Sequence, residues 1–319
     1  MKKIAILTSG GDAPGMNAGI RAICRSAIYH DIEVYGVRNG FQGLIDGEVF
    51  KMDITSVADI IHRGGTFLGT SRSSEFKTDE GFKKALNVIS VFNFDCIFIL
   101  GGEGTFKGAN ALKEKGINVI CIPCTIDNDL GYTDYTIGFF TALTTVTNAI
   151  GNIRDTTEAH GRANVVEVMG RHCGDIALYA GVAGGAENII IPEKDVPLEE
   201  IAEKVIAGKN RGKRHHIIVL AEGTMDPYEA AKKLTEMTGV DTRVTILGYL
   251  QRGGEPTVVD RILATAMGKI AVDLFLKGET GVALGYVGNK IRKMELGKAI
   301  AVENTFNEKL YEILKLVSI

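Results

Sequence analysis

A short acidic segment follows a strongly apolar stretch in the first half of the chain. Thr125, Asp127 and Asp129 lie within five positions, directly after the apolar residues 119–122. In an extended turn, side chains two positions apart point the same way, so both carboxylates can face one cleft. One carboxylate there is suited to accept a proton from a substrate hydroxyl. A polar turn whose Asp and Asn side chains only bind backbone amides would explain the same residues.

Two glycine-rich turns upstream favour a phosphate site over a purely structural turn. Residues 9–15 follow an apolar strand and precede a helix, and residues 101–105 do the same. Helix N-termini offer free amides to anions, and glycine lets the backbone approach phosphate oxygens closely. Neither turn has the Gly-Lys-Ser or Gly-Lys-Thr of a P-loop, and neither has the glycine spacing of the dinucleotide fingerprint. With the acidic segment, they indicate phosphoryl transfer.

Phosphoryl transfer also requires a divalent cation and positively charged clamps. Glu103, within the second glycine turn, is a candidate ligand for Mg²⁺, which takes carboxylates and water. Arginine suits bidentate phosphate binding. The candidates lie at loop positions: Arg72, Arg162, Arg171, Arg243 and Arg252. Solvated surface charges are the alternative for each of them, although Arg171 and Arg252 stand beside glycine-containing turns.

The elements that must hold these residues alternate between apolar strands and amphipathic helices. The predicted strands are 4–8, 34–37, 95–100, 119–122, 164–168, 188–191, 216–220, 243–247, 282–287 and 297–301. The predicted helices are 16–29, 56–61, 79–91, 106–115, 139–155, 174–183, 198–207, 227–238, 257–276 and 307–317. This alternation predicts an α/β fold with parallel sheets, which bind ligands at the carboxyl ends of their strands.

Composition sets broad limits on the function. A chain of 319 residues suggests about two domains, and a net charge of −3 gives no bias toward nucleic acid or membrane. We expect no membrane span and no signal peptide, and therefore a cytoplasmic protein. Five cysteines suit a reducing compartment. Cys121 and Cys124 form a C-x-x-C, but no helix and no second pair follow, which argues against a redox or zinc site.

Six motifs, in this order, resemble the bacterial ATP-dependent 6-phosphofructokinases: residues 9–17, 64–66, 101–104, 125–129, 166–171 and 247–254. The resemblance covers essentially the whole chain. It implies two Rossmann-like three-layer αβα domains with mostly parallel sheets. Residues 1–138 and 251–301 would bind ATP, and residues 139–250 and 302–319 would bind fructose 6-phosphate. A homotetramer would transfer the γ-phosphate of ATP–Mg²⁺ to the sugar 1-hydroxyl, the committed step of glycolysis.

The resemblance also assigns roles to single residues. The catalytic group would be Asp127, the base, with Thr125, Arg171 and Gly11. The ATP site would comprise Gly11, Phe41, Arg72, Ser73, Gly102, Glu103, Gly104, Thr105 and Gly108, with Glu103 at the metal position. The sugar-phosphate site would comprise Thr125, Asp127, Asp129, Arg162, Met169, Gly170, Arg171, Glu222, Arg243, Tyr249 and Arg252, with Arg162 and Arg243 coming from a neighbouring subunit. An effector site for ADP or phosphoenolpyruvate would comprise Arg21, Arg25, Asp59, Arg154, Gly185, Glu187, Arg211 and Lys213.

Four positions depart from the family pattern. Glu103 replaces an Asp of the metal site, Tyr249 a substrate-site His, Ser73 an aromatic residue under the adenine, and Ile54 an effector-site Arg. These changes bear on rate, base stacking and effector response, and leave the expected fold unaffected.

Two rival functions remain open. A pyrophosphate-dependent phosphofructokinase would carry Asp at position 104 and Lys at 124; this chain has Gly104 and Cys124, which favours ATP. A paralogue that senses phosphosugars or nucleotides without turnover is the second rival. Retention of Asp127, Thr125 and Arg171 argues against it.

Overall fold

The computed structural model describes residues 1–318, which form two compact units. Unit 1 comprises Met1–Thr141 and Arg252–Asn304, and unit 2 comprises Ala142–Gln251 and Thr305–Ile319. Ile319, the last residue of the expected second domain, lies outside the described residues. The chain therefore crosses between the units three times.

Unit 1 is built on a seven-stranded sheet. Its order is β11-β10-β5-β4-β1-β2-β3, parallel except for the edge pairs β2–β3 and β10–β11. The strands are β1 (Lys3–Thr8), β2 (Glu33–Val37), β3 (Val49–Met52), β4 (Cys96–Gly101), β5 (Val119–Pro123), β10 (Val282–Val287) and β11 (Lys290–Glu295). Every residue of β4 and β5 is buried, as expected for central strands of a parallel sheet that is covered on both faces.

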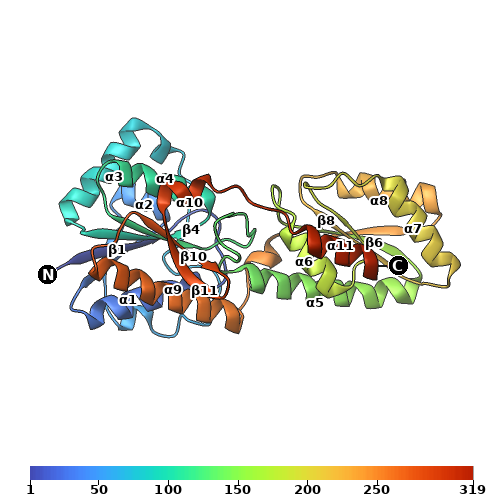
Figure 1. The fold of residues 1–319 in the computed structure, drawn as a ribbon, viewed down its shortest axis with the longest axis horizontal. Coiled ribbons are helices and arrows are strands. Elements are labelled where there is room, and N and C mark those ends of the chain that lie inside the picture. The colour runs from blue at the N-terminus through green and yellow to red at the C-terminus, as the bar shows by residue number, and fades with distance from the viewer. Residues whose placement is uncertain (319) are drawn as a thin grey trace. The chain divides into compact units, whose positions relative to one another are not determined.

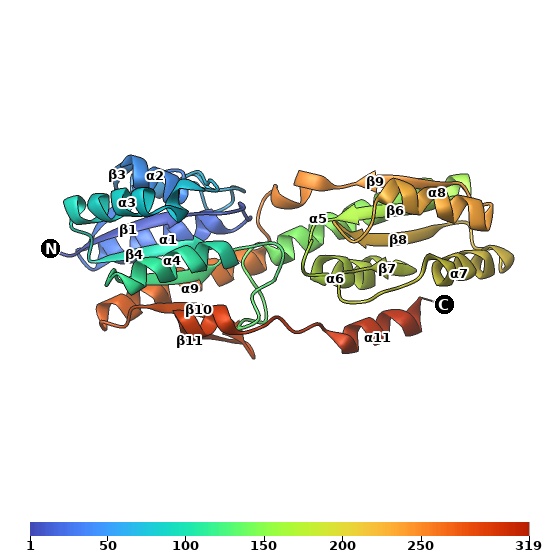
Figure 2. The ribbon, with the colours of Figure 1, turned by 90° about the horizontal axis from the view of Figure 1, so that it is seen from above.

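Helices cover both faces of this sheet (Figure 1, Figure 2). One face carries α1 (Met16–Tyr29) and α9 (Val258–Leu276), which pack closely because Gly19 and Gly268 leave no side chain between them. The other face carries α2 (Gly40–Asp46), α3 (Asp79–Phe92), α4 (Glu103–Glu114) and α10 (Leu296–Ala301). A core of Leu, Ile and Phe side chains joins these helices to the strands.

Unit 2 is a smaller α/β layer structure. Its sheet has the order β7-β8-β6-β9 and is parallel throughout. The strands are β6 (Ala163–Val168), β7 (Asn188–Ile190), β8 (His216–Ala221) and β9 (Thr242–Ile246). The helices are α5 (Phe139–His160), whose first three residues belong to unit 1, α6 (Asp175–Gly184), α7 (Leu198–Asn210), α8 (Pro227–Thr238) and α11 (Glu308–Val317). With both units so built, the predicted α/β fold with mostly parallel sheets is confirmed.

Two predicted elements are wrong. The helix predicted over 56–61 is only a 3₁₀ turn, Thr55–Val57, since Asp59 has a φ of 53° and cannot continue a helix. The strand predicted over 297–301 is the helix α10, whose start is capped by the Glu295 carboxylate through the Lys298 amide at 2.8 Å. The strand lies earlier, as β11, because Gly288 and Asn289 turn the chain with positive φ angles of 57° and 61°.

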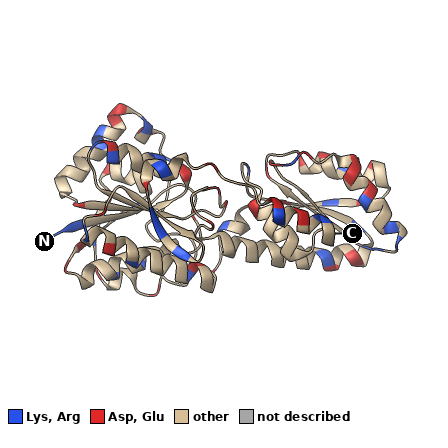
Figure 3. Cartoon of the chain, in the orientation of Figure 1, with Lys and Arg blue, Asp and Glu red and all other residues tan. Residues whose placement is uncertain are grey.

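Charged residues of both signs occur in both units. Lys and Arg are interspersed with Asp and Glu over the helices of both units (Figure 3). Within residues 1–318, no helix is both long and apolar enough to cross a membrane.

Candidate active site

A cavity of about 790 Å³ opens in unit 1 at the carboxyl ends of three neighbouring strands. β1, β4 and β5 lie next to one another in the sheet, so the turns that follow them meet at one edge. All three turns line the cavity, through Ser9–Asp12, Gly102–Thr105 and Cys124–Asp127. The predicted convergence of the glycine turns and the acidic segment is therefore what the fold produces.

The first glycine turn is fixed by the loop that carries Arg72. Gly10 has a φ of 87°, its amide donates to the Ser71 carbonyl at 3.4 Å, and its carbonyl accepts from the Thr70 hydroxyl at 2.9 Å. Gly11 lies against the Arg252 guanidinium, and a Cβ at this position would overlap it. Glycine at 11 thus lets Arg252, which also lines the cavity, approach the backbone of the turn.

The second glycine turn is the start of a helix. α4 begins at Glu103, three residues before the predicted position, and no side chain caps it at Gly102. The first amides of the helix are available to an anion in the cavity. A Cβ at Gly104 would meet no protein atom within 4 Å, so a side chain there would project into open space.

The acidic turn is shaped by Asn128. This residue has a φ of 54° and is buried, and its amide oxygen accepts from the Thr136 amide at 3.0 Å. Thr136 in turn donates its hydroxyl to the Thr125 carbonyl at 2.6 Å. These bonds hold Asp127 and Asp129, on either side of Asn128, where both line the cavity.

Glu103 is the predicted metal ligand. It lines the cavity at the start of α4, its side chain is half exposed, and it pairs with Lys107 at 2.5 Å. Among residues 1–318 no cluster of three or more His, Cys, Asp or Glu side chains forms a self-contained metal site. A single carboxylate fits Mg²⁺, which proteins hold through one or two carboxylates together with phosphates and water.

All predicted ATP-site residues line this cavity, and so do several residues that the sequence did not single out. The additional residues are Phe76, Lys77, Thr78, Asp79, Phe82, Lys107, Ala111, Glu114 and Lys115. They extend the cavity away from the glycine turns. The signal that would have found them is helical spacing on α4, because Gly104, Gly108, Ala111 and Lys115 recur on one face.

The other predicted substrate residues lie in unit 2. Met169, Gly170 and Arg171 follow β6, and Glu222 follows β8, its amide donating to the Val168 carbonyl at 2.8 Å. The Arg171 side chain lies against Gly223, where a Cβ would be 3.0 Å from its Cγ. These residues therefore gather at the carboxyl ends of β6 and β8.

Tyr249 lies in a 3₁₀ turn, Gly248–Arg252, and is 83% exposed.

Arg162 and Arg243 lie at the opposite end of the same sheet. Arg162 precedes β6, Arg243 is the second residue of β9, and both pair with the Asp241 carboxylate, at 2.8 and 2.9 Å. β6 spans roughly 16 Å from Ala163 to Val168, at about 3.3 Å per residue. One copy of unit 2 therefore does not bring these two arginines to the same place as Met169 and Arg171.

Comparison with known proteins decides the family. Residues 3–275 match the phosphofructokinase family. The chain belongs to this family. It is 55% identical to the ATP-dependent 6-phosphofructokinase of Finegoldia magna and 54% identical to that of Alkaliphilus metalliredigens, over the full length of each. The resemblance drawn from the six sequence motifs is thereby confirmed.

Solved structures agree with this assignment. The phosphofructokinase of Saccharomyces cerevisiae has a TM-score of 0.89 and 35% identity over 98% of this chain, which spans 50% of the yeast chain. A pyrophosphate-dependent phosphofructokinase from Marinobacter aquaeolei has a TM-score of 0.84 at 24% identity, over 97% of this chain and 86% of its own, and so shows the shared fold alone.

The residues matching the family's effector site are divided between the two units. In unit 2, Arg154 donates to the Gly185 carbonyl at 3.0 Å, and Glu187 pairs with Lys213 at 2.6 Å. Arg211 ends the helix α7, two residues before Lys213. In unit 1, Arg21 and Arg25 are one turn apart on α1, and Asp59 is exposed in the loop after the 3₁₀ turn. Ile54, at the family's arginine position, is half exposed.

Two histidines that the sequence analysis passed over adjoin Glu187. His215 lies 3.5 Å from its carboxylate, and His216 is buried, with its ring 3.0 Å from the Asn188 amide. Burial lowers the pKa of His216 to about 4; Glu187 opposes this shift, whereas electrostatic interactions with Lys213, His215 and Lys204 add to it. His216 is therefore neutral in the folded protein at neutral pH.

This burial predicts a loss of stability in mild acid. Between pH 6.5 and 4 the unfolded chain binds a proton at His216 that the folded chain does not, so the stability contribution present above pH 6.5 falls as the pH drops. The loss is about 2 kcal/mol by pH 5. Urea unfolding followed by circular dichroism at pH 7 and pH 5 measures it. His216→Gln should lose correspondingly less stability than the wild type over this interval, and equal losses would contradict the assignment.

All five cysteines lie inside the fold. Within the part of the chain that the structure describes, no disulfide joins them, and each is buried. Burial raises the pKa of Cys24 to about 12, and it also raises the pKa of Cys121 and of Cys124 well above that of a free thiol. These thiols remain protonated and unreactive at neutral pH.

Proposed function

We propose that this protein is an ATP-dependent 6-phosphofructokinase, which transfers the γ-phosphate of ATP to the 1-hydroxyl of fructose 6-phosphate in glycolysis. The observation that supports this proposal most directly is that the acidic turn Thr125–Asp129 and the two glycine turns line one cavity. The names of the relatives that are 55% and 54% identical over the whole chain support the substrates.

Each part of the cavity would have a distinct task. The amides of Gly11 and of the first turn of α4, with Arg72, would bind the phosphates. Asp127 would accept the proton of the attacking sugar hydroxyl, with Thr125 beside it. Asp129, Arg252 and the unit 2 residues Met169, Gly170, Arg171, Glu222 and Tyr249 would bind the sugar phosphate, with Arg171 also stabilising the transferring phosphoryl group. Unit 1 would be the ATP-binding domain and unit 2 the sugar-phosphate-binding domain.

The open space at position 104 favours ATP over pyrophosphate. Because a Cβ at Gly104 meets nothing within 4 Å, an Asp side chain there would extend into the cavity beside the helix amides, where it would repel phosphate. A coupled assay with fructose 6-phosphate and either ATP or pyrophosphate tests the proposal. Turnover with ATP but not with pyrophosphate supports it. Turnover with pyrophosphate but not with ATP would show that pyrophosphate is the phosphoryl donor. Substrate binding without turnover would show that the protein is a sensing paralogue.

Mg²⁺ is the metal that the residues present would suit. Glu103 would hold it together with the phosphates of the bound nucleotide, and the cation would neutralise the charge that develops on them. In the structure Glu103 instead pairs with Lys107 one helical turn away, so the metal and the lysine compete for one carboxylate.

This competition makes Glu103→Asp a gain-of-function prediction. The shorter arm reaches Lys107 less easily and carries less rotamer entropy, so it should be freer to bind the cation. We expect a two- to threefold higher kcat or a lower Mg²⁺ concentration for half-activity, a gain of about 0.5 kcal/mol. The wild type should also tolerate Mn²⁺. Titrating both metals against both proteins at saturating ATP measures this; a slower variant with a higher metal requirement would show that the turn is adapted to glutamate.

A homotetramer with shared sites would explain the two groups of substrate residues in unit 2. Since Arg162 and Arg243 lie at the far end of the sheet from Met169 and Arg171, they would serve the site of a neighbouring copy. Mixing inactive Asp127→Ser subunits with inactive Arg243→Ala subunits should restore activity through hybrid sites. No recovery after demonstrated subunit exchange would count against sharing.

Regulation and location follow the same proposal. ADP or phosphoenolpyruvate would bind weakly, because Ile54 offers no charge. The residues that would bind this effector are Arg21, Arg25, Asp59, Arg154, Gly185, Glu187, Arg211 and Lys213. Free cysteines and water-soluble substrates suit the cytoplasm.

A further inference from the structure

The far wall of the cavity is aromatic. Phe41 on α2 and Phe76 in the 3₁₀ turn Glu75–Lys77 are stacked, with ring centroids 4.2 Å apart and planes 18° apart. Both rings pack on α4 at Gly108, where a Cβ would be 2.7 Å from Phe41 and 3.3 Å from Phe76. Gly108 is five residues beyond Glu103, about 8 Å along the helix from the phosphate-binding end. The wall is therefore offset from the glycine turns along one continuous cavity.

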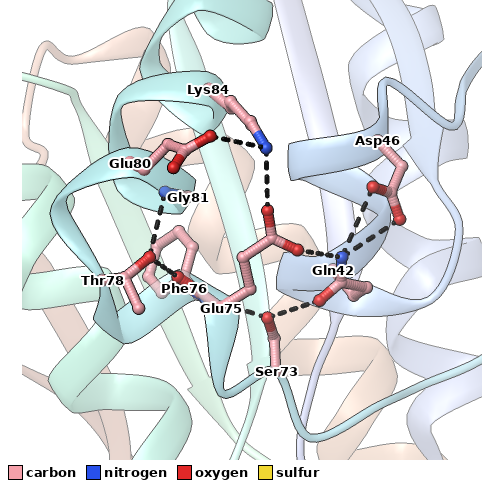
Figure 4. A network of polar contacts seen from close by, with 9 residues as sticks. All are labelled: Gln42, Asp46, Ser73, Glu75, Phe76, Thr78, Glu80, Gly81 and Lys84. Atoms are coloured by element: carbon pink, nitrogen blue, oxygen red, sulfur yellow. Dashed lines mark hydrogen bonds and ion pairs between the residues drawn. The ribbon is translucent and has the colours of Figure 1, made fainter.

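A polar network joins the two segments that carry these rings (Figure 4). The Ser73 hydroxyl donates to the Gln42 amide oxygen at 2.7 Å and accepts from the Phe76 amide at 3.0 Å. The Gln42 amide nitrogen donates to Glu75 at 3.1 Å and to Asp46 at 3.2 Å. Gln42 is the neighbour of Phe41 in sequence, and Ser73 binds the backbone amide of Phe76. The hydrogen bond between Gln42 and Ser73 therefore fixes the Phe41 ring relative to the Phe76 ring.

Each donor and acceptor in this network has a defined direction. The Gln42 amide nitrogen faces two carboxylates, so its oxygen must face Ser73, and the hydroxyl proton of Ser73 is committed to it. The second oxygen of Glu75 pairs with Lys84 on α3 at 3.1 Å, and Lys84 also pairs with Glu80 at 3.3 Å. Gln42 and Lys84 together lower the pKa of Glu75, which keeps it an acceptor.

We propose that Gln42, Ser73 and Glu75 are positioning residues that hold the Phe41–Phe76 wall in place for the base of a nucleoside triphosphate. The proposal rests on the proposed function for the presence of a nucleotide. The polyphosphate would lie on the glycine turns and the base against the aromatic wall, where stacking and apolar contact stabilise it. Ser73 then acts through its hydrogen bonds to Gln42 and to the Phe76 amide. It would thus have a role in the base site although it has no aromatic ring of its own.

The test separates base binding from phosphate binding. Inorganic tripolyphosphate occupies phosphate sites but has no base. Gln42→Met conserves side-chain volume while it removes the hydrogen bonds of the amide to Asp46, Glu75 and Ser73. By calorimetry, it should weaken ATP binding about tenfold and tripolyphosphate binding less than twofold. In the coupled assay, KM for ATP should rise by a similar factor, while kcat and KM for fructose 6-phosphate change less than twofold.

Two further variants keep the result interpretable. Glu75→Gln retains an acceptor for Gln42 and should change ATP affinity no more than threefold. Lys83→Met makes the same kind of replacement at an exposed position of α3 outside the drawn network and should change nothing.

The outcomes separate the positioning role from the proposed function. Equal weakening of ATP and tripolyphosphate by Gln42→Met, or no weakening of either, would overturn the positioning role. Wild-type protein that binds ATP no better than tripolyphosphate would overturn the wall as a base site. Lack of phosphoryl transfer by the wild type would overturn the proposed function, and the binding comparison would still decide the role of Gln42.

Discussion

Asp127→Ser is expected to lower kcat by about 10²–10⁴, the usual cost of losing a general base. The serine hydroxyl cannot take the proton of the attacking sugar hydroxyl, whereas the glycine turns that bind phosphate are untouched. ATP affinity should therefore stay within about threefold of the wild-type value. The coupled assay at saturating ATP and fructose 6-phosphate measures kcat, and calorimetry with ATP measures binding.

Asp129→Ser is the matched comparison, because it makes the same replacement two residues further along the same turn. If Asp129 contacts the sugar phosphate and Asp127 takes the proton, Asp129→Ser should chiefly raise KM for fructose 6-phosphate. The two variants then differ in which kinetic constant changes. An Asp127→Ser protein that retains more than half of its activity would remove Asp127 from the role of base.

The meeting of the glycine turns and the acidic turn could be predicted from local sequence patterns. Each apolar strand that ends in a glycine or acidic turn could be recognised, and neighbouring strands of a parallel sheet bring such turns together. This reasoning predicted that Gly11, Gly104 and Asp127 line one place, and the structure brings them around one cavity. The fold followed from the same alternation of strands and helices.

Contacts between distant segments could not be predicted in this way. The role of Gln42 depends on residues from Ser73 to Lys84 folding back on α2, and nothing in its neighbours in sequence indicates this. The misassigned segment 297–301 has a different cause, which lies in the residues just before it. Apolar residues there suit strand or helix equally, and the preceding hairpin with β10 and the Glu295 cap select the helix.

Asp260 is the clearest case of a buried residue whose role only the structure reveals. It is fully buried on α9, and its carboxylate accepts from the amides of Gly138 and Thr141, at 2.9 and 2.8 Å, and from the Thr141 and Thr257 hydroxyls. Gly138 directly precedes α5 and Thr141 lies in its first turn, where amides have no partner within the helix. Asp260 therefore caps α5 from another helix, and its negative charge suits that helix terminus.

Asp260→Ala is expected to destabilise the protein by about 3–5 kcal/mol, because the buried donors on α5 lose their acceptor and a cavity replaces the carboxylate. Burial raises the pKa of Asp260 despite its hydrogen bonds, so the charge is costly to hold there and the donors must compensate for it. Asp273→Ala is the control on the same helix: Asp273 pairs with Lys269, is partly exposed, and should cost no more than about 0.5 kcal/mol. Urea unfolding of both variants measures the difference. If Asp260→Ala were as stable as Asp273→Ala, then water or a shift of α5 satisfies these amides, and the cap is not what holds the start of α5 beside the acidic turn.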